Sequence, residues 1–410
     1  MQLPPIIKKP KPLDEKDVNR ALGYIENYWP KLTRDYKETR GTLIGMPHPY
    51  IVPSPGRDDF HFDEQYYWDS YIIAVGLLDP KHQAMVEGML ENLLYLFKTY
   101  GLIPNASRMY MLSRSQPPVL TSFIFLVYER YGKSLEWLEE KMAIAELEYM
   151  TVWMSTHHPL WHQVHKGLSR YYDINMLHDL AEAESGWDMT PRFQRKALDY
   201  LPIDLNCLLY KYEKDFARTA ELLGKHDEEK KWLIASETRR NNVNKLMWGK
   251  IRAFYFDYNY QKKELGNVWS LAAYYAMWSG LATEEQALKM TENLSRFEHR
   301  GGLSTTAALF MYPQLFGSTK SQWAHPNGWA PLHFIVTEGL ERYGYAPEAR
   351  SIAYKWLRTN LNWFTKHGHF LEKYNVVTPE KKPVEGLYPS QTGFGWTNAV
   401  FNYYADKYID

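Results

Sequence analysis

The chain has 410 residues, of which 45% are apolar, so it can bury a large folded core. Its 48 basic and 48 acidic residues balance to a formal net charge of zero, which argues against nucleic acid or an anionic membrane as a partner. The 15 Trp and 32 Tyr suit either a large helical core or a surface on which sugar rings stack.

Cys207 is the single cysteine, so no disulfide can form within the chain, and a reducing compartment is expected. The first residues contain no apolar stretch of signal-peptide length. No apolar run approaches the ~20 residues that a membrane-spanning helix needs. The sequence therefore predicts a cytoplasmic protein that does not cross a membrane.

Helical periodicity dominates the chain from end to end. Apolar residues recur every three or four positions between 84 and 100, which predicts a helix with one buried face. Comparable patterns predict helices over residues 16–30, 118–131, 135–155, 174–184, 203–223, 227–247, 268–279, 284–295, 331–343, 347–363 and 396–408. Only residues 251–258 and 368–371 suggest short strands.

Long connections rich in Pro, Gly and aromatic residues separate these helices, at 45–68, 101–118, 185–193, 296–330 and 372–395. Alternating short and long connections predict paired helices in an all-α toroid, with the functional residues on long loops at one end. The sequence shows no linker and no repeat, so residues 1–410 are expected to form a single domain.

Two connections carry carboxylates in aromatic surroundings. Asp188 follows Gly186 and Trp187, and Glu372 lies in the segment from Leu371 to Asn375. Glycosidic bond cleavage uses two carboxyl groups: one is kept protonated to help the leaving oxygen, and the other activates water or attacks directly. Burial beside Trp187 is one way to raise the pKa of a carboxyl to suit a general acid.

The neighbours of Asp188 also have simpler interpretations. Glu184 fits the role of a charge at the end of a helix. Thr190 and Pro191 resemble the N-cap and first residue of a helix, which would place Asp188 on the connection before it.

Further loops supply groups that suit a polar sugar. Trp68 and Asp69 can stack a ring and accept hydrogen bonds, although Asp69 equally fits the cap of a following helix. Asn105, Arg114 and Gln116 mix hydrogen-bond donors and acceptors, although a capped loop with a surface ion pair explains them as well. The loops around Trp323 and Trp396 resemble these in composition.

Metal and nucleotide sites find little support in the sequence. The histidines at 157, 158, 162 and 165 cluster, but no recognised ligand spacing completes a zinc site, so solvent-facing or core histidines are expected. The sequence contains no phosphate-binding glycine loop, no dinucleotide fingerprint and no Gly-x-Ser-x-Gly elbow.

Taken in order, these segments resemble the trehalases, a family of inverting glycosidases, and more distantly the clan that includes the glycosylglycerate hydrolases. The matching stretches span residues 60 to 400 and are Tyr66–Tyr71, Gly101–Asn105, Ser113–Pro118, Glu184–Asp188, Gln322–Trp323, Pro326–Pro331, Glu372–Tyr374 and Gly393–Asn398.

The resemblance implies an all-α (α/α)6 barrel of about twelve helices that needs no metal and no other cofactor. Asp188 matches the family's general acid and Glu372 its general base, which in an inverting enzyme lie ~6.5–9.5 Å apart. The substrate-binding residues expected from the resemblance are Phe62, Trp68, Asp69, Asn105, Arg114, Gln116, Arg170, Gly186, Trp187, Trp323 and Trp396.

The chain departs from the family pattern at elements that grip or cover the substrate. Three extra residues follow Pro55-Gly56-Arg57, and His61 then stands where the family has an arginine. Ala324 replaces an aspartate of the family pattern. Residues 167–173 replace an Arg-Pro-Glu-Ser-Tyr element, with Arg170 as the candidate for its arginine. Leu387 replaces a glutamate in a shortened lid over residues 376–389.

The leading hypothesis is hydrolysis of α,α-trehalose to two glucoses, with a small disaccharide or glycoside as the partner. The alternative is the same chemistry on glucosylglycerate or mannosylglycerate, whose carboxylate Arg114, Arg170 or Lys373 would bind. A non-catalytic sugar-binding protein and a structural helical scaffold are the hypotheses from other classes. The sequence does not indicate an oligomeric state.

Overall fold

The computed structural model describes residues 12–56, 61–188, 190–308, 321–386 and 388–409. Arg57 and Leu387, both named above for their place in the family pattern, lie outside these ranges.

Helices make up most of the described chain. Their bounds are α1 (Glu15–Glu26), α2 (Trp29–Leu32), α3 (Tyr67–Val75), α4 (Gln83–Tyr100), α5 (Leu120–Tyr131), α6 (Leu135–Glu148), α7 (His178–Glu184), α8 (Ile203–Leu222), α9 (His226–Met247), α10 (Tyr275–Trp278), α11 (Glu284–Glu292), α12 (Ala330–Arg342), α13 (Ala346–His367) and α14 (Gly395–Tyr408).

The strands are short and pair antiparallel within the connections. Their bounds are β1 (Thr33–Arg34), β2 (Tyr50–Ile51), β3 (Gln163–His165), β4 (Leu168–Ser169), β5 (Tyr200–Leu201), β6 (Trp248–Gly249), β7 (Phe254–Tyr255), β8 (Tyr258–Asn259), β9 (Glu264–Leu265), β10 (Glu298–His299), β11 (Gly302–Leu303), β12 (Asn327–Trp329) and β13 (Lys373–Asn375).

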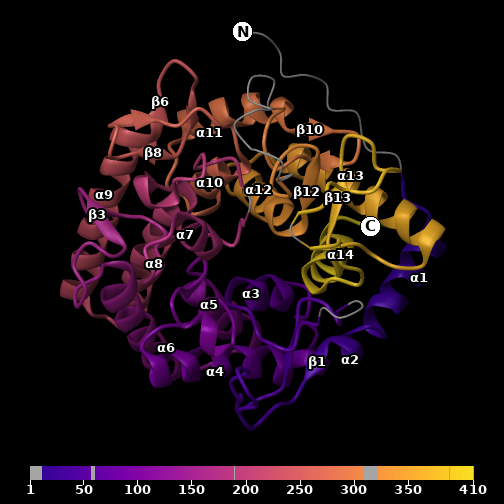
Figure 1. The fold of residues 1–410 in the computed structure, drawn as a ribbon, viewed down its shortest axis with the longest axis horizontal. Helices are drawn as coiled ribbons and strands as arrows, with labels where there is room; N and C mark the ends of the chain where they lie inside the picture. Colours follow the sequence, from indigo (N-terminus) through magenta and orange to yellow (C-terminus); the bar gives the residue numbers. More distant parts are fainter. Residues whose placement is uncertain (1–11, 57–60, 189, 309–320, 387, 410) are drawn as a thin grey trace.

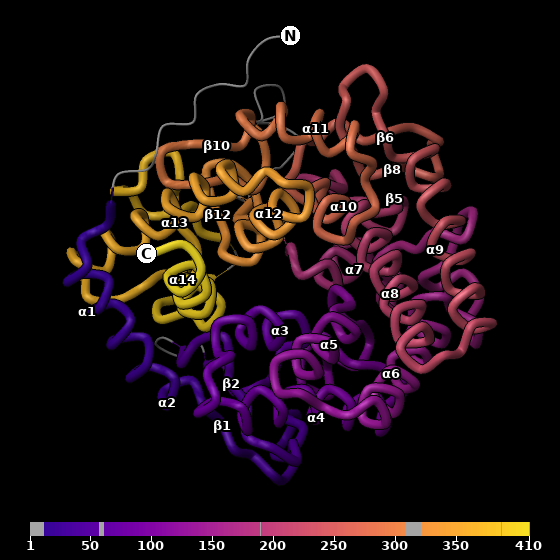
Figure 2. Tube along the Cα trace, turned by 180° about the vertical axis from the view of Figure 1, so that it is seen from behind, coloured from indigo at the N-terminus to yellow at the C-terminus, as the bar shows by residue number. Residues whose placement is uncertain are grey.

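Two concentric layers of helices form a closed barrel (Figures 1 and 2). In the inner layer α3 contacts α5, and contacts continue through α8, α10, α12 and α14 back to α3. In the outer layer α1, α4, α6, α9, α11 and α13 surround this ring. The predicted all-α (α/α)6 barrel is therefore confirmed.

The two layers differ in the way they bury side chains. Every residue of α3 is buried, as expected for an inner helix that meets protein on all sides. The outer helix α9 instead buries Trp232, Ser236, Arg239, Val243 and Met247, which recur every three or four residues on one face.

Several helix ends differ from the prediction by up to four residues, as at the start of α7 and the end of α13, and three predicted segments differ in kind. The segment 16–30 contains two helices, α1 and α2. The segment 135–155 leaves α-helical geometry at Tyr149, where one π-helical turn runs to Trp153. The segment 268–279 is a 3-10 turn followed by the short helix α10.

The helix α3 was missed, because residues 60–71 were predicted to be a loop. Because α3 is buried on all sides and only Asp69 and Ser70 interrupt its apolar and aromatic residues, it shows no helical stripe. Of the two suggested strand regions, 251–258 contains β7 and the start of β8. In 368–371 only Leu371 forms an isolated bridge, to Thr392.

The inner helices α3, α12 and α14 begin close together. Trp68 in the first turn of α3 and Trp329, the N-cap of α12, both contact the ring of Trp396 in the first turn of α14. The pair β12–β13 lies at the same end and sets Trp329 opposite Lys373. None of the described helices combines the length and apolarity that a bilayer crossing requires.

Candidate active site

Three carboxylates from distant parts of the chain share one site. Asp69 lies in the first turn of α3, Asp188 in the turn after α7, and Glu372 directly before β13. The charge of Glu372 raises the pKa of both Asp69 and Asp188, which places the three side chains within electrostatic reach of one another.

The turn that carries Asp188 is closely packed against aromatic rings. Gly186 has φ +71°, and a Cβ there would lie 3.0 Å from the Trp68 ring, so glycine satisfies both the backbone and the contact. Trp187 is fully buried and stacks on Trp323, with ring centroids 5.4 Å apart. The expected helix at Thr190 is absent: this segment continues as turns, and the Thr190 N–H donates to Glu182 instead.

A buried ion cluster supports this turn from behind. The Arg192 side chain is fully buried and donates to Asp204 at 2.6 and 2.8 Å and to Asp257 at 2.7 and 3.0 Å. Its guanidinium lies 4.6 Å from the centroid of the Trp187 ring. The cluster therefore fixes the residue that precedes Asp188.

The environment of Asp188 favours its protonated form. Burial, followed by the charge of Glu372, raises its pKa to about 6. Nε2 of Gln322 donates to Oδ2 of Asp188 at 3.3 Å. A carboxyl with this pKa holds its proton in a substantial fraction of molecules near neutrality, as a general acid must.

Glu372 is fully buried but held among hydrogen-bond donors. Nζ of Lys373 lies 2.8 Å from Oε2, and the Tyr388 hydroxyl donates to Oε1 at 2.8 Å. The Gln391 N–H donates to Oε2 at 3.4 Å. These contacts hold both oxygens of the Glu372 carboxyl in place, as a general base that must face a water molecule requires.

Burial is the chief cause that raises the pKa of Asp69 to about 8. It lies inside the first turn of α3 and not at the N-cap, which is Tyr66. The interpretation of Asp69 as a cap for a following helix is therefore wrong, and its side chain is available to the site.

Tryptophan rings line the space beside the carboxylates. Trp323 stacks on Trp329 with centroids 3.9 Å apart, and lies 6.0 Å from Trp68 and 6.3 Å from Trp396. Trp329 belongs to one of the matching stretches but was not among the predicted site residues. Phe62, by contrast, contacts Phe394 at 6.2 Å, towards the edge of this cluster.

Asn105 and Gln116 hold the backbone around the site. Nδ2 of Asn105 donates to the carbonyls of Ser115 and Ala183, at 3.0 and 3.2 Å, and so ties this loop to the helix before Asp188. Oε1 of Gln116 accepts from the Trp68 N–H at 3.0 Å. Both residues therefore position the residues that flank the carboxylates.

Arg170 is engaged by the surrounding scaffold. It donates to the carbonyls of Trp161, Leu198 and Leu160 and to the Tyr260 hydroxyl, at 2.8–3.1 Å. These bonds join the connection around β3 and β4 to the segment before β5, and none of them reaches the carboxylate group of the site.

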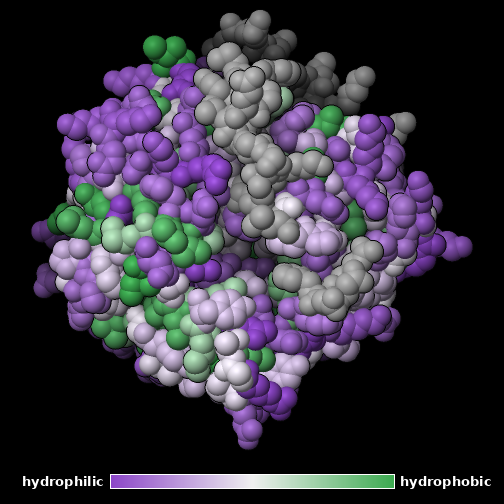
Figure 3. All heavy atoms as spheres, viewed as in Figure 1, coloured by the Kyte–Doolittle hydropathy of each residue, from purple (hydrophilic) through white to green (hydrophobic). Residues whose placement is uncertain are grey.

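Arg114 lines a separate pocket of about 540 Å³ together with Trp161 and Tyr172. Its Nη1 donates to Asp173 at 3.0 Å. Hydrophobic residues gather on the surface over the region of β3, α5 and α6 (Figure 3). The exposed apolar side chains of the chain include Leu160 near this pocket.

Glu184 ends α7, as expected, but it is fully buried and joins three segments. It accepts from the backbone N–H groups of Ser115 and Tyr172 at 2.8 and 2.6 Å, and its Oε2 lies 3.0 Å from His162 Nε2. The other histidines of the cluster are exposed or half-buried, which fits the expected solvent-facing and core roles. Within the described ranges, no group of three or more His, Cys, Asp or Glu could hold a metal ion.

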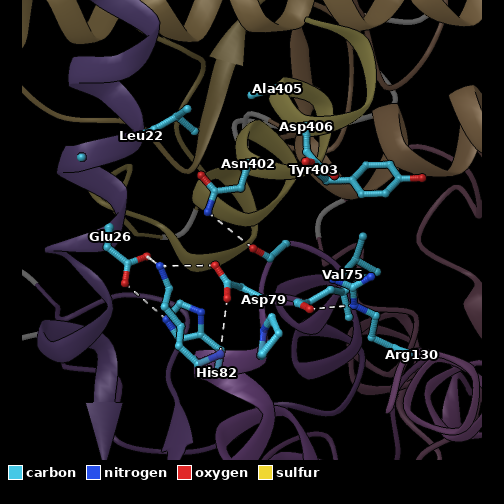
Figure 4. Close-up of a pocket in the computed structure, with 15 residues that line it drawn as sticks. Leu22, Glu26, Val75, Asp79, His82, Arg130, Asn402, Tyr403, Ala405 and Asp406 are labelled. Carbon is cyan, nitrogen blue, oxygen red and sulfur yellow. Dashed lines mark hydrogen bonds and ion pairs between the residues drawn. The ribbon is translucent and has the colours of Figure 1, made fainter. Parts of the chain in front are cut away.

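A larger pocket of about 790 Å³ lies away from the carboxylates (Figure 4). Its lining comes from α1, the last residue of α3, the turn at Asp79 and the second half of α14. Trp68 and Trp396 lie at the opposite ends of α3 and α14, so this pocket belongs to the other end of the barrel. Glu26 and His82 lie next to each other in its lining, with 3.5 Å between Oε1 and Nε2.

Comparison with known proteins identifies the family. The trehalase family model matches residues 8–176 and 157–408, and the two matches together span nearly the whole chain. The chain belongs to the trehalase family. It is accordingly a glycoside hydrolase.

Individual relatives agree with this assignment. This trehalase-family chain is 32% identical to the periplasmic trehalase of Xanthomonas axonopodis pv. citri (strain 306), with 92% of this chain and 71% of the relative covered. It is 31% identical to the periplasmic trehalase of Escherichia coli O8 (strain IAI1), with 92% and 72% covered. The prediction of a cytoplasmic location is therefore wrong, because these relatives are named as periplasmic proteins.

Solved structures share the barrel. Neutral trehalase Nth1 from Saccharomyces cerevisiae superposes with a TM-score of 0.83 at 27% identity, covering 96% of this chain and 94% of that one. The GH63 mannosylglycerate hydrolase from Thermus thermophilus superposes with a TM-score of 0.68, covering 94% and 100%, but its 17% identity supports the fold alone.

Proposed function

We propose that this member of the trehalase family hydrolyses α,α-trehalose to two glucose molecules with inversion at the attacked carbon. The observation that carries the proposal is the contrast between two neighbouring carboxyls. The pKa of Asp188 is raised to about 6, whereas Glu372 is surrounded by donors from Lys373 and Tyr388. Environments that separate two carboxyls in this way are typical of an acid and base pair.

In this mechanism Asp188 donates its proton to the glycosidic oxygen as the bond from that oxygen to the anomeric carbon breaks. Glu372 removes a proton from a water molecule, whose oxygen forms the new bond on the opposite face of the ring. One glucose leaves as the α anomer, and the attacked ring becomes the β anomer. The cycle closes when Glu372 returns a proton to solvent and Asp188 regains one.

We assign sugar binding first to the groups that lie beside the carboxylates. Trp68 and Trp396 offer aromatic surface, Trp323, which stacks on Trp187 and Trp329, offers its ring edge, and Asp69 offers hydrogen bonds to hydroxyls. Gly186 and Trp187 shape the same wall. For Asn105 and Gln116 we propose an indirect contribution through the backbone that they hold, and for Phe62 a place at the edge.

The names of the curated relatives and the contacts of the cations favour trehalose over an anionic glycoside. Arg170 and Lys373, two of the three candidates for binding a glycerate carboxylate, already donate to protein groups. Arg114, the third candidate, also donates to Asp173, and it lines a pocket that is distinct from the carboxylate group.

The test is glucose release from trehalose by the wild-type protein and by the Asp188→Asn and Glu372→Gln variants, beside glucosylglycerate and mannosylglycerate. We expect the wild type to favour trehalose and either substitution to abolish turnover. Hydrolysis of a glycerate glycoside alone would refute the substrate assignment. Trehalose binding without turnover would support a sugar-binding protein, and no binding at all would support a scaffold.

The periplasmic names of the curated relatives lead us to propose a periplasmic location as well. Fractionation of the source cells tests it: recovery of the chain with periplasmic markers is the expected result, and recovery with cytosolic markers would contradict it.

A further inference from the structure

Two side chains connect the carboxyls of Asp188 and Glu372. The Tyr388 hydroxyl donates to Oε1 of Glu372 at 2.8 Å. The side-chain amide of Gln322 donates to Oδ2 of Asp188 at 3.3 Å, and it also lowers the pKa of the Tyr388 hydroxyl against the larger effect of burial. The acid and the base therefore each accept from one side chain, and these two side chains influence one another.

The backbone around Gln322 is built to hold this amide in place. Its carbonyl accepts from Nδ2 of Asn327 at 3.0 Å and from Nε1 of Trp329 at 3.1 Å. A Cβ on Gly386 would lie 2.6 Å from Cδ of Gln322, so only glycine leaves room for the amide here. A loosely placed glutamine would not require such close packing.

The segment that carries Tyr388 is anchored to the same residues. Asn327 donates through Nδ2 to the Val384 carbonyl at 2.8 Å and accepts from the Val384 N–H at 2.9 Å. The Tyr388 ring lies over Nζ of Lys373, with 5.6 Å from Nζ to the centroid. One asparagine thus fixes the segment before Tyr388 and the backbone of Gln322 together.

We propose that Tyr388 and Gln322 are positioning residues that orient the Glu372 and Asp188 carboxyls and couple their protonation. This inference rests on the function proposed above, because it assigns Glu372 as base and Asp188 as acid. The tyrosine hydroxyl donates to the Glu372 carboxyl and keeps it turned towards the water. The glutamine amide orients Asp188 and polarises the tyrosine hydroxyl towards Glu372.

The two contacts affect opposite limbs of the pH profile, and loss of either donor moves its limb upward. Loss of the Tyr388 donor removes a hydrogen bond that the charged form of the Glu372 carboxyl accepts, so activity is lost at a higher pH on the acidic side. Loss of the Gln322 donor destabilises ionised Asp188, so the acid keeps its proton to a higher pH and the basic limb moves upward.

Other charged groups also face these carboxyls. Glu372 meets Lys373 of its own segment, Asp188 from the turn after α7 and Asp69 from α3. Asp188 meets Glu372 and Lys373. Since the substitutions below change none of these charges, a shift of either limb reports the lost donor. Because Asp188 and Glu372 lie close enough to interact, the apparent pKa of each limb is a property of the two carboxyls together.

The experiment is the pH profile of kcat/KM on trehalose for the wild type, Tyr388→Phe, Gln322→Met and the double variant. Tyr374→Phe is the matched control, because this buried tyrosine lies two residues from Glu372 but its hydroxyl accepts from the Leu371 N–H. We expect Tyr388→Phe to raise the acidic limb by about one pH unit.

We expect Gln322→Met to raise the basic limb, and to raise the acidic limb by a smaller amount. That smaller acidic shift should be absent when Tyr388 is already phenylalanine, because the amide acts on Glu372 through the hydroxyl. Tyr374→Phe should leave both limbs in place.

An unmoved acidic limb in Tyr388→Phe, or an equal shift in Tyr374→Phe, would overturn the inference. If Tyr388→Phe does not fold, Gln322→Met decides alone, and an unmoved basic limb would overturn it. A bell-shaped wild-type profile with an inactive Glu372→Gln variant and unmoved limbs would reject only the positioning network. A wild type that does not cleave trehalose would reject the proposed function and this inference together.

Discussion

The variant Arg192→Met tests whether the buried ion cluster behind Trp187 stabilises the fold. The Arg192 side chain is fully buried and donates to Asp204 and Asp257 at 2.6–3.0 Å. Methionine fills a similar volume but removes the positive charge, so both carboxylates lose the cation that compensates their burial. Breaking a buried pair from one side typically costs about 3–5 kcal/mol.

This cost converts into a measurable change in Tm. At about 2.1 cal/mol/K per residue, the entropy of unfolding for 410 residues is about 0.9 kcal/mol/K, so Tm should fall by about 4–6 °C. Burial already raises the pKa of Asp257 while the arginine is present. Without the arginine that pKa rises further, so the stability deficit is small at low pH and grows as pH rises through it.

The assay is differential scanning calorimetry at pH 5 and pH 7.5 on the wild type, Arg192→Met and Arg195→Met. Arg195 is the matched control, because its side chain is 64% exposed and its nearest carboxylate, that of Asp179, lies 3.9 Å away. The control should shift Tm by less than about 1 °C. The stabilising role of the cluster would be refuted if the Tm of Arg192→Met lay within about 1 °C of the wild-type Tm. It would also be refuted if the loss of Tm were larger at pH 5 than at pH 7.5.

Two further substitutions probe the site and the core. Gly186→Ala should lower kcat/KM and reduce the free energy of unfolding by at least about 1 kcal/mol, because φ is +71° and the new Cβ lies 3.0 Å from Trp68. Activity assays and urea unfolding measure the two effects, and wild-type values in both would contradict the contact. Burial raises the pKa of Glu148 from 4.5 to about 7, so its stabilising contribution is complete below pH 4.5 and is lost as pH rises through 7. Glu148→Gln should therefore flatten the fall in stability between pH 5 and pH 7.5 by up to about 2.5 kcal/mol in urea unfolding, and an unchanged pH dependence would count against a raised pKa at this buried carboxyl.

The sequence predicted the barrel because most of its helices show an amphipathic stripe. Helices such as α9 alternate a buried and an exposed face, and this pattern is visible without a structure. The inner helix α3 is buried on all sides, so periodicity could not reveal it. The short α10 follows a 3-10 turn, and the two together have the pattern of one helix.

The site was predictable residue by residue but not as an arrangement. Asp188 and Glu372 stood out as a possible pair through their aromatic neighbours, yet the assignment of one as acid and the other as base came from the family resemblance, because nothing local links positions so far apart. The contacts of Arg192 and Tyr388 are long-range and left no local signal. The lone Cys207 excluded an internal disulfide but carried no further information about compartment.

The most direct test of the account is proton NMR of the anomers formed during the first minutes of trehalose hydrolysis, beside Asp188→Asn and Glu372→Gln. Inversion with Asp188 as acid and Glu372 as base predicts equal amounts of α- and β-glucose before mutarotation, and no product from either variant. The α anomer alone would show retention, and turnover by either variant would show that the pair is not the catalytic acid and base.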